Sequence, residues 1–181
     1  KIIESGGNKM IFNEKTINEV NEFTGKILKL DVRTVELPNG KTSKREIVKH
    51  PGGVAILAFK DKDTVLLVEQ FRNPLGKTIL EIPAGKLEPN EEIEVCGRRE
   101  LEEETGYKSN KFTYLGKIVT SPGFCDECIY IYKAEELYKG NIGGDEDEFI
   151  NNYEIKLDRL REMIKNGEII DGKTIAALTF L

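Results

Sequence analysis

The sequence has little chemistry of the kind that nucleophilic hydrolases use. Its 181 residues include one histidine, His50, and no GxSxG motif. A catalytic serine or cysteine needs a neighbouring base, most often a histidine. A Ser-His or Cys-His mechanism is therefore poorly supported.

Cysteine is also scarce, with three residues in the chain. An odd count fits a reducing compartment better than a disulfide framework, so we expect a cytoplasmic protein. Cys125 and Cys128 form a CxxC motif, but a tetrahedral zinc site needs two further ligands. The remaining candidates are only Cys96 and His50, and we expect the cysteines to have packing roles.

Long apolar runs and excess positive charge are absent. No run approaches the roughly 18 to 20 apolar residues that span a bilayer, and the opening KIIESGGNKMIF lacks the apolar stretch of a signal peptide. A net charge of −5 argues against a nucleic-acid-binding surface. We expect neither a membrane nor a nucleic acid as partner, although a metal and a few arginines would still permit an anionic substrate.

The first third of the chain has the pattern of β-strands. KILKLDVRTVEL and SKREIVKH alternate on either side of Asn39-Gly40, a strong hairpin signal. After PGG, the runs VAILAF and TVLLVEQF predict a second pair of strands joined by residues 61–63, and VAILAF is apolar on both faces, as in the centre of a sheet. We expect a tail and small antiparallel β-sheet module over residues 1–50 and a larger α/β domain over residues 51–181.

The second half alternates helices and strands. A helix is predicted to open at Asn90-Glu91-Glu92 and to end at Thr105-Gly106, with Gly106 as its C-cap. FTYLGKIVT, CIYIYKA and NNYEIKL predict strands, and GNIGGDEDEF a loop. Asp158 is expected to cap the helix DRLREMIKNG, and GKTIAALTFL is the predicted last helix.

One face of the helix before Gly106 predicts close packing. Ile93, Gly97 and Leu101 recur every four residues and form a narrow apolar stripe. A glycine in mid-helix costs about 1 kcal/mol relative to alanine. That cost indicates that another element approaches the backbone of Gly97.

Another face of this helix collects carboxylates. Glu100, Glu103 and Glu104 lie close together on it, and like charges at this spacing destabilise a helix. A solvated acidic face is one interpretation. The other is a site for a hard divalent cation, which prefers oxygen ligands and turns the repulsion into coordination. The spacing alone leaves both open.

The longer pattern around these glutamates is specific. From Gly85 the sequence runs through Glu91 to Arg99-Glu100-Leu101-x-Glu103-Glu104-x-Gly106-Tyr107. This resembles the signature of the Nudix hydrolases, G-x5-E-x7-R-E-U-x-E-E-x-G-U, in which U is a bulky apolar residue. Every fixed position matches, and only Tyr107 departs, being aromatic where the family is aliphatic.

The resemblance implies a fold and a cofactor. The expected fold is α/β, a Nudix α/β/α sandwich around a mixed sheet, with the small N-terminal antiparallel β-sheet module. The resemblance also implies Mg²⁺- or Mn²⁺-assisted hydrolysis of a nucleoside diphosphate linked to another moiety. The implied metal ligands are Glu100, Glu104 and the backbone carbonyl of Ala84. Glu103 belongs to the same catalytic face, and Arg99 is expected to orient the glutamates through charge-assisted hydrogen bonds.

Stretches outside the signature are similar to the ADP-ribose pyrophosphatase branch of this family. They are LPNGKTSKREIVKHPG, VEQFR, LEIPAGKLE and SPGFCDE, the last with Pro122 where the branch carries a marker proline. The resemblance implies a homodimer in which the N-terminal sheet packs across a second subunit and each active site shares residues of both chains. It implies substrate contacts by Arg45, Arg72, Ser121, Pro122, Gly123 and Glu127.

The resemblance also implies catalytic and metal-binding roles for residues of the acidic loop over residues 143–148. By resemblance, Glu146 is the general base and Glu148 a further metal ligand, although the two assignments can be exchanged. The expected reaction converts ADP-ribose to AMP and ribose 5-phosphate. The alternatives are a Nudix hydrolase of another nucleotide sugar or dinucleotide, such as GDP-mannose, FAD or NADH, and a non-catalytic module that binds ADP-ribose.

Overall fold

The computed structural model describes residues 12–141 and 150–181, and these form two compact units. The described residues up to His50, with Gly123–Cys125, make up the N-terminal unit. Pro51–Pro122 and Asp126–Leu181 belong to the main unit. Within the described ranges, no helix combines the length and the apolar character needed to cross a membrane.

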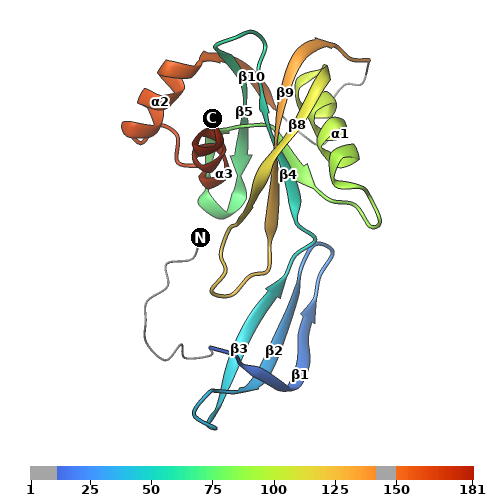
Figure 1. Cartoon of the computed structure of the whole chain (residues 1–181), viewed down its shortest axis with the longest axis vertical. Helices are drawn as coiled ribbons and strands as arrows, with labels where there is room; N and C mark the ends of the chain where they lie inside the picture. Colours follow the sequence, from blue (N-terminus) through green and yellow to red (C-terminus); the bar gives the residue numbers. More distant parts are fainter. Residues whose placement is uncertain (1–11, 142–149) are drawn as a thin grey trace, which may run out of the picture. The chain divides into compact units, whose positions relative to one another are not determined.

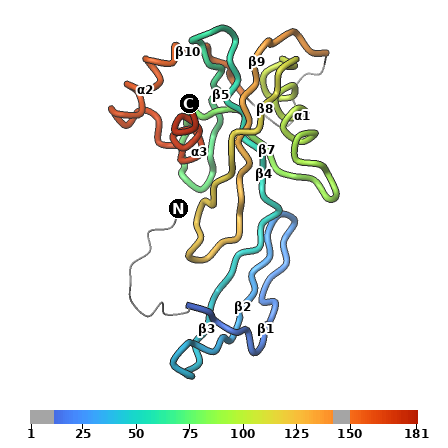
Figure 2. Tube along the Cα trace, viewed as in Figure 1, coloured from blue at the N-terminus to red at the C-terminus, as the bar shows by residue number. Residues whose placement is uncertain are grey.

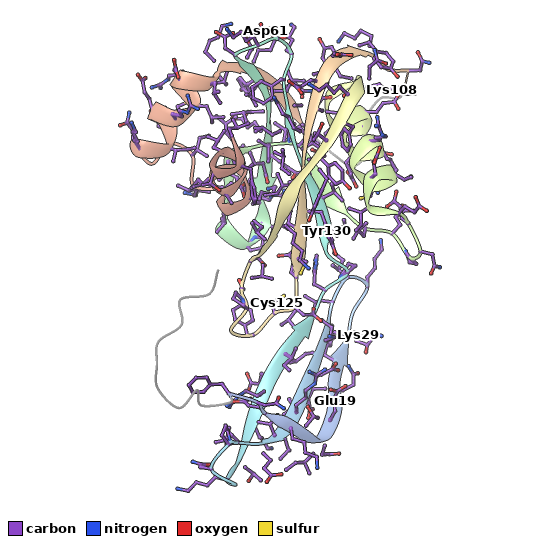
Figure 3. All side chains as sticks on the ribbon, viewed as in Figure 1. Glu19, Lys29, Asp61, Lys108, Cys125 and Tyr130 are labelled. Atoms are coloured by element: carbon purple, nitrogen blue, oxygen red, sulfur yellow. The ribbon has the colours of Figure 1, made fainter. Side chains whose placement is uncertain are left out.

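The N-terminal unit is a three-stranded antiparallel sheet. Its strands are β1 (Lys15–Thr24), β2 (Lys29–Glu36) and β3 (Thr42–Lys49), in that order. Glu19 on β1 and Lys29 on β2 are labelled in Figure 3. The predicted hairpin at Asn39-Gly40 is confirmed, because β2 pairs with β3 across it and Gly40 adopts the left-handed φ of 79°.

Strand β1 was not predicted from the sequence. All ten of its residues are exposed, so no alternation of buried and exposed positions marks it as a strand. Its apolar residues Ile17, Val20 and Phe23 recur every third position. Register shifts between Thr16 and Asn18 and between Asn21 and Phe23 break the strand period further.

The main unit contains two sheets. The four-stranded sheet has the order β7-β4-β9-β8 and the three-stranded sheet the order β10-β5-β6. Figure 1 shows both sheets in the part of the chain that also carries the helices. The strands are β4 (Gly53–Ala58), β5 (Thr64–Arg72), β6 (Lys77–Glu81), β7 (Ala84–Lys86), β8 (Tyr107–Val119), β9 (Cys128–Lys139) and β10 (Asn151–Lys156).

Strands β4 and β5 do not form the pair that the sequence predicted. They belong to different sheets, and an isolated bridge links Phe59, the residue after β4, to Val65 of β5. The turn between them carries Asp61, which is labelled in Figure 3. Its carboxylate accepts hydrogen bonds from the backbone N–H groups of Asp63 and Thr64. Local patterning indicates two strands and a turn, but it does not indicate that the chain changes sheet at the turn.

Strand β4 is the centre of a three-layer arrangement. All of its residues are buried, as its apolar pattern predicted. Ala55 and Leu57 pack into a core with residues of helices α2 and α3, whereas Ile56 and Ala58 pack with Leu101 of helix α1. Figure 1 shows α1 on one side of the sheets and α2 and α3 on the other, so the predicted α/β/α sandwich is confirmed.

The helices follow the sequence prediction with small shifts. They are α1 (Ile93–Thr105), α2 (Leu157–Lys165) and α3 (Gly172–Ala177), with short 3-10 turns at Asn73–Leu75 and Leu178–Phe180. Gly106 ends α1 in the left-handed conformation, as predicted. Asp158 does not cap α2, because the N-cap residue is Lys156. Asp158 lies inside the first turn, where its negative charge interacts favourably with the helix dipole.

Gly97 lies where α1 meets the sheet, as its mid-helix position predicted. A Cβ at position 97 would come within 2.8 Å of Cγ1 of Val54 and 3.0 Å of Cζ of Phe112. The first distance is shorter than real contacts and the second is tight, so a side chain at position 97 would require Val54, Phe112 or the helix to move. Strands β4 and β8 therefore approach α1 at its backbone.

Candidate functional site

The carboxylate face of α1 lies against the short strand β7. The backbone N–H of Ala84 donates to Oε2 of Glu104 at 2.9 Å. A Cβ at position 85 would lie only 1.8 Å from Cδ of Glu100, so the Glu100 carboxylate occupies the space that glycine leaves. Figure 2 follows the chain from β7 into α1. Two of the predicted metal ligands and the segment carrying the third are thus brought together.

Arg99 is the positive centre of this face. Its Nη1 donates to Oε1 of Glu100 at 2.7 Å and to Oε2 of Glu103 at 2.8 Å. Its Nε and Nη2 donate to the two oxygens of Glu91, each at 2.9 Å. One guanidinium therefore holds three carboxylates in place, which is the geometry expected of an orienting residue.

Glu91 was not assigned a role from the sequence, although it occupies a fixed position of the signature. Its side chain is only 11% exposed in the contact with Arg99. The hydrogen bond from Arg99 lowers the pKa of Glu91 to about 2, from an ordinary value of 4.5. Glu91 therefore stays ionised at neutral pH and serves as a permanent counter-charge for Arg99.

The donor set fits a hard divalent cation. Glu100, Glu104 and the carbonyl of Ala84 offer oxygen ligands only, which suits Mg²⁺. In the part of the chain that the structure describes, no three His, Cys, Asp or Glu side chains are grouped closely enough to hold an ion. Glu100 is hydrogen-bonded to Arg99, and Glu104 to the backbone of Ala84. These contacts fix the two carboxylates on this face of α1.

Arg72 is the last residue of β5 and belongs to the main unit. Its Nε and Nη2 donate to the two oxygens of Glu81 at 2.7 and 2.8 Å. These hydrogen bonds raise the pKa of Arg72, and the charges of Glu81, Glu104 and Asp171 add to the effect. Of these three residues, Glu104 belongs to the carboxylate face of α1.

Ser121, Pro122 and Glu127 belong to the connection between β8 and β9. Pro122 is exposed, and Ser121 and Glu127 are half-buried. The hydroxyl of Thr120 donates to Oε2 of Glu127 at 2.6 Å, and its backbone N–H donates to the Glu127 carbonyl. The connection is therefore closed at its base, and a direct role of these residues in substrate binding stays a prediction.

Arg45 and Gly123 belong to the N-terminal unit. Arg45 lies on β3, and its Nε and Nη2 donate to the carboxylate of Glu14 at 3.0 and 2.6 Å. Gly123 has no atom within 4 Å of the position of a Cβ, so its surroundings are open. Their predicted contacts with the substrate remain predictions.

Two predicted residues lie outside the described ranges. Glu146, the expected base, and Glu148, the expected extra ligand, both fall in the segment 142–149. All three cysteines are free. Burial raises the pKa of the Cys96 thiol to about 12, so this cysteine is a packing residue and not a nucleophile.

A family model matches most of the chain. It is that of the NUDIX domain, and it matches residues 49–178. The chain belongs to the Nudix family, and the prediction of a Nudix enzyme is confirmed. Enzymes of this family generally use divalent metal ions.

Several proteins with known names are similar to this chain over most of its length. The chain is 50% identical over 173 residues to the methanol dehydrogenase activator of Bacillus methanolicus, covering 94% of each chain. It is 50% identical over 170 residues to the ADP-ribose pyrophosphatase of Bacillus subtilis, covering 93% of this chain and 92% of the relative. It is 40% identical over 149 residues to an Escherichia coli GDP-mannose pyrophosphatase, covering 76% and 77%.

A solved structure supports the fold independently. The crystal structure of an ADP compounds hydrolase superposes with a TM-score of 0.84 and covers 95% of this chain and 94% of its own. Its sequence identity is 20%, so the likeness concerns the fold alone.

Proposed function

We propose that this protein is a metal-dependent pyrophosphatase that hydrolyses ADP-ribose to AMP and ribose 5-phosphate. The observation that carries the proposal is the carboxylate face of α1, held by Arg99 against Ala84 and Gly85. Identity of 50% to an ADP-ribose pyrophosphatase over nearly the whole chain supports the choice of substrate. The three cysteines of this chain are free, which suits a reducing compartment such as the cytoplasm.

The residues of α1 and β7 would hold the ion. We assign Glu100, Glu104 and the Ala84 carbonyl as ligands, with Mg²⁺ as the favoured ion and Mn²⁺ as an alternative. A bound cation lowers the pKa of water and offsets the charge of the pyrophosphate. Arg99 keeps Glu100 and Glu103 ordered on this face.

Other residues complete the proposed mechanism. Arg72 pairs with phosphate oxygens, because a fork-shaped guanidinium matches their geometry. Glu146 takes the proton of the attacking water, and Glu148 adds a metal ligand. Further substrate contacts are assigned to Arg45, Ser121, Pro122, Gly123 and Glu127.

Release of the nucleoside monophosphate from a panel of compounds, AMP or in the case of GDP-mannose GMP, tests this proposal. The panel contains ADP-ribose, GDP-mannose, FAD, NADH and ADP-glucose, each assayed with Mg²⁺, with Mn²⁺ and with a chelator. We expect ADP-ribose to be preferred by at least about tenfold in kcat/KM, because a site that hydrogen-bonds one sugar leaves polar groups unpaired with another. Preference for another compound would refute the substrate, and turnover in chelator would refute the metal.

Activation of a methanol dehydrogenase is the second candidate function. It is favoured by the 50% identity to the Bacillus methanolicus activator over 94% of both chains. Adding the protein to a methanol dehydrogenase and following alcohol oxidation distinguishes the two. Stimulation without any turnover of the panel would favour the activator, and turnover without stimulation would favour the pyrophosphatase.

We propose that the protein is a homodimer with shared active sites, the N-terminal sheet forming the interface. Within the described residues, this sheet leaves Ile17, Val20 and Phe23 of β1 about half exposed, at 54%, 46% and 55%. A ten-residue edge strand that is exposed throughout and carries three large apolar side chains is unusual in a monomer. Light scattering should give twice the chain mass of 20.5 kDa, and Phe23→Glu should lower it to one chain. A wild-type monomer at micromolar concentration would refute the proposal.

A further inference from the structure

A group of four charges links the end of β5, β6 and the start of α3 in the main unit. Three of its side chains are largely buried, and that of Arg72 is 40% exposed. Its carboxylates are Glu81 and Asp171, and its cations are Arg72 and Lys173. The Glu81 side chain is 1% exposed and the Lys173 side chain 9%. Both cations bond to the one Glu81 carboxylate, Arg72 through two nitrogens and Lys173 through Nζ. Burial of this many charges is costly unless each is paired, so the arrangement requires an explanation.

The first turn of α3 holds this group in place. Asp171, the N-cap residue, accepts a hydrogen bond from the backbone N–H of Thr174 at 2.9 Å, and Lys173 Nζ lies 3.1 Å from Oδ1 of Asp171. The hydroxyl oxygen of Thr174 accepts from the backbone N–H of Ile82 at 2.9 Å. The first turn of α3 therefore holds two neighbouring groups of the sheet: the Glu81 side chain through Lys173, and the Ile82 backbone through Thr174.

The Arg72 guanidinium has one edge that Glu81 does not use, and this edge includes Nη1. Glu81 occupies Nε and Nη2, and no protein acceptor for Nη1 is found among the described residues. If Glu81 paired with Arg72 alone, the two charges would cancel, and the carboxylate could turn. Lys173 supplies a second positive charge to Glu81, so Arg72 keeps charge and orientation for an incoming anion.

We propose that Lys173 is a positioning residue, which acts through Glu81 to hold Arg72 ready for a phosphate of the substrate. The inference rests on the proposed function, in which Arg72 binds the pyrophosphate. The competing explanation is that the four charges only attach α3 to the sheet. That explanation predicts a loss of stability without a specific change in substrate binding.

A double-mutant cycle separates the two explanations. Lys173→Met should raise KM for ADP-ribose by about tenfold and change kcat by less than about threefold, because the lost interaction is a charge-assisted one in binding. Arg72→Ala should raise KM by more, up to about a hundredfold. The double variant should match Arg72→Ala, since Lys173 acts only through Arg72.

Two further variants serve as controls. Lys165→Met removes an exposed lysine at the end of α2 and should leave KM unchanged. Lys173→Arg, which retains a donor and a positive charge, should restore KM to within about threefold. If Lys173→Met does not fold, Lys173→Gln replaces it, because its amide still donates to Glu81.

The possible outcomes distinguish this inference from the proposed function. Additive effects of Lys173→Met and Arg72→Ala, or an unchanged KM in folded Lys173→Met, overturn the inference while the proposed function stands. If the wild type prefers another compound of the panel, the cycle is run with that compound. Failure of the wild type to hydrolyse any compound overturns both.

Discussion

A Glu104→Gln variant should stay folded and lose nearly all turnover of ADP-ribose. The amide oxygen of glutamine can still accept the hydrogen bond from the Ala84 N–H, so the contact between α1 and β7 survives. The charge that would bind the cation is lost. A deficit of roughly 3–5 kcal/mol in transition-state stabilisation lowers kcat by about two to four powers of ten.

Glu94→Gln is the matched control for this change. Glu94 lies on the same helix but pairs with Arg98, and its side chain is 52% exposed. Thermal melting and Mn²⁺ binding should be measured for both variants beside steady-state kinetics. We expect weakened ion binding only in Glu104→Gln. A folded Glu104→Gln protein with near-normal kcat would show that Glu104 is not a metal ligand.

Arg99→Met should destabilise the protein strongly when divalent ions are absent. The change leaves Glu91, Glu100 and Glu103 without their shared cation. Removing one partner of a buried ion pair costs about 3–5 kcal/mol, and because Arg99 is 27% exposed we expect roughly 2–4 kcal/mol in the free energy of unfolding. Saturating Mg²⁺ should recover part of this loss, because an ion bound only to the folded state stabilises it.

Acid unfolding gives a second measure of the Arg99→Met effect. The pKa of Glu91 is about 2 in the folded protein, against an ordinary value of 4.5. Ionised Glu91 therefore stabilises the folded wild type at pH values above 4.5, and this stabilisation is lost as the pH falls from 4.5 towards 2. In Arg99→Met the pKa returns towards 4.5, so the acid transition should move to higher pH.

The neighbouring arginine provides the control for Arg99→Met. Arg98 pairs with exposed Glu94 and lies over the Phe112 ring. Arg98→Met should cost about 1 kcal/mol or less, with no dependence on Mg²⁺. Equal losses in the two variants, or an Arg99→Met loss that Mg²⁺ does not change, would contradict the orienting role of Arg99.

The sequence predicted the parts of this protein that depend on local pattern. The signature specified α1 and its end at Gly106, and Asn39-Gly40 specified a hairpin, because each needs only neighbouring residues. It also predicted close packing at Gly97. These features follow from backbone conformation and helix periodicity.

The parts that the sequence did not predict depend on distant residues or on solvent. Strand β1 has no buried face, so hydrophobic alternation could not reveal it. The contact between Lys173 and Glu81 joins residues 92 positions apart, and no local pattern connects them. The separation of β4 from β5 into two sheets is likewise a matter of topology.

The close approach of Gly85 to Glu100 also has an entropic consequence. A free glutamate loses about 1.5–2 kcal/mol of rotamer freedom when it is fixed. Here Gly85, the Ala84 N–H and Arg99 already confine Glu100 and Glu104. If Glu100 and Glu104 bind an ion as proposed, folding has already ordered them, and less of the free energy of ion binding would be spent on ordering these side chains.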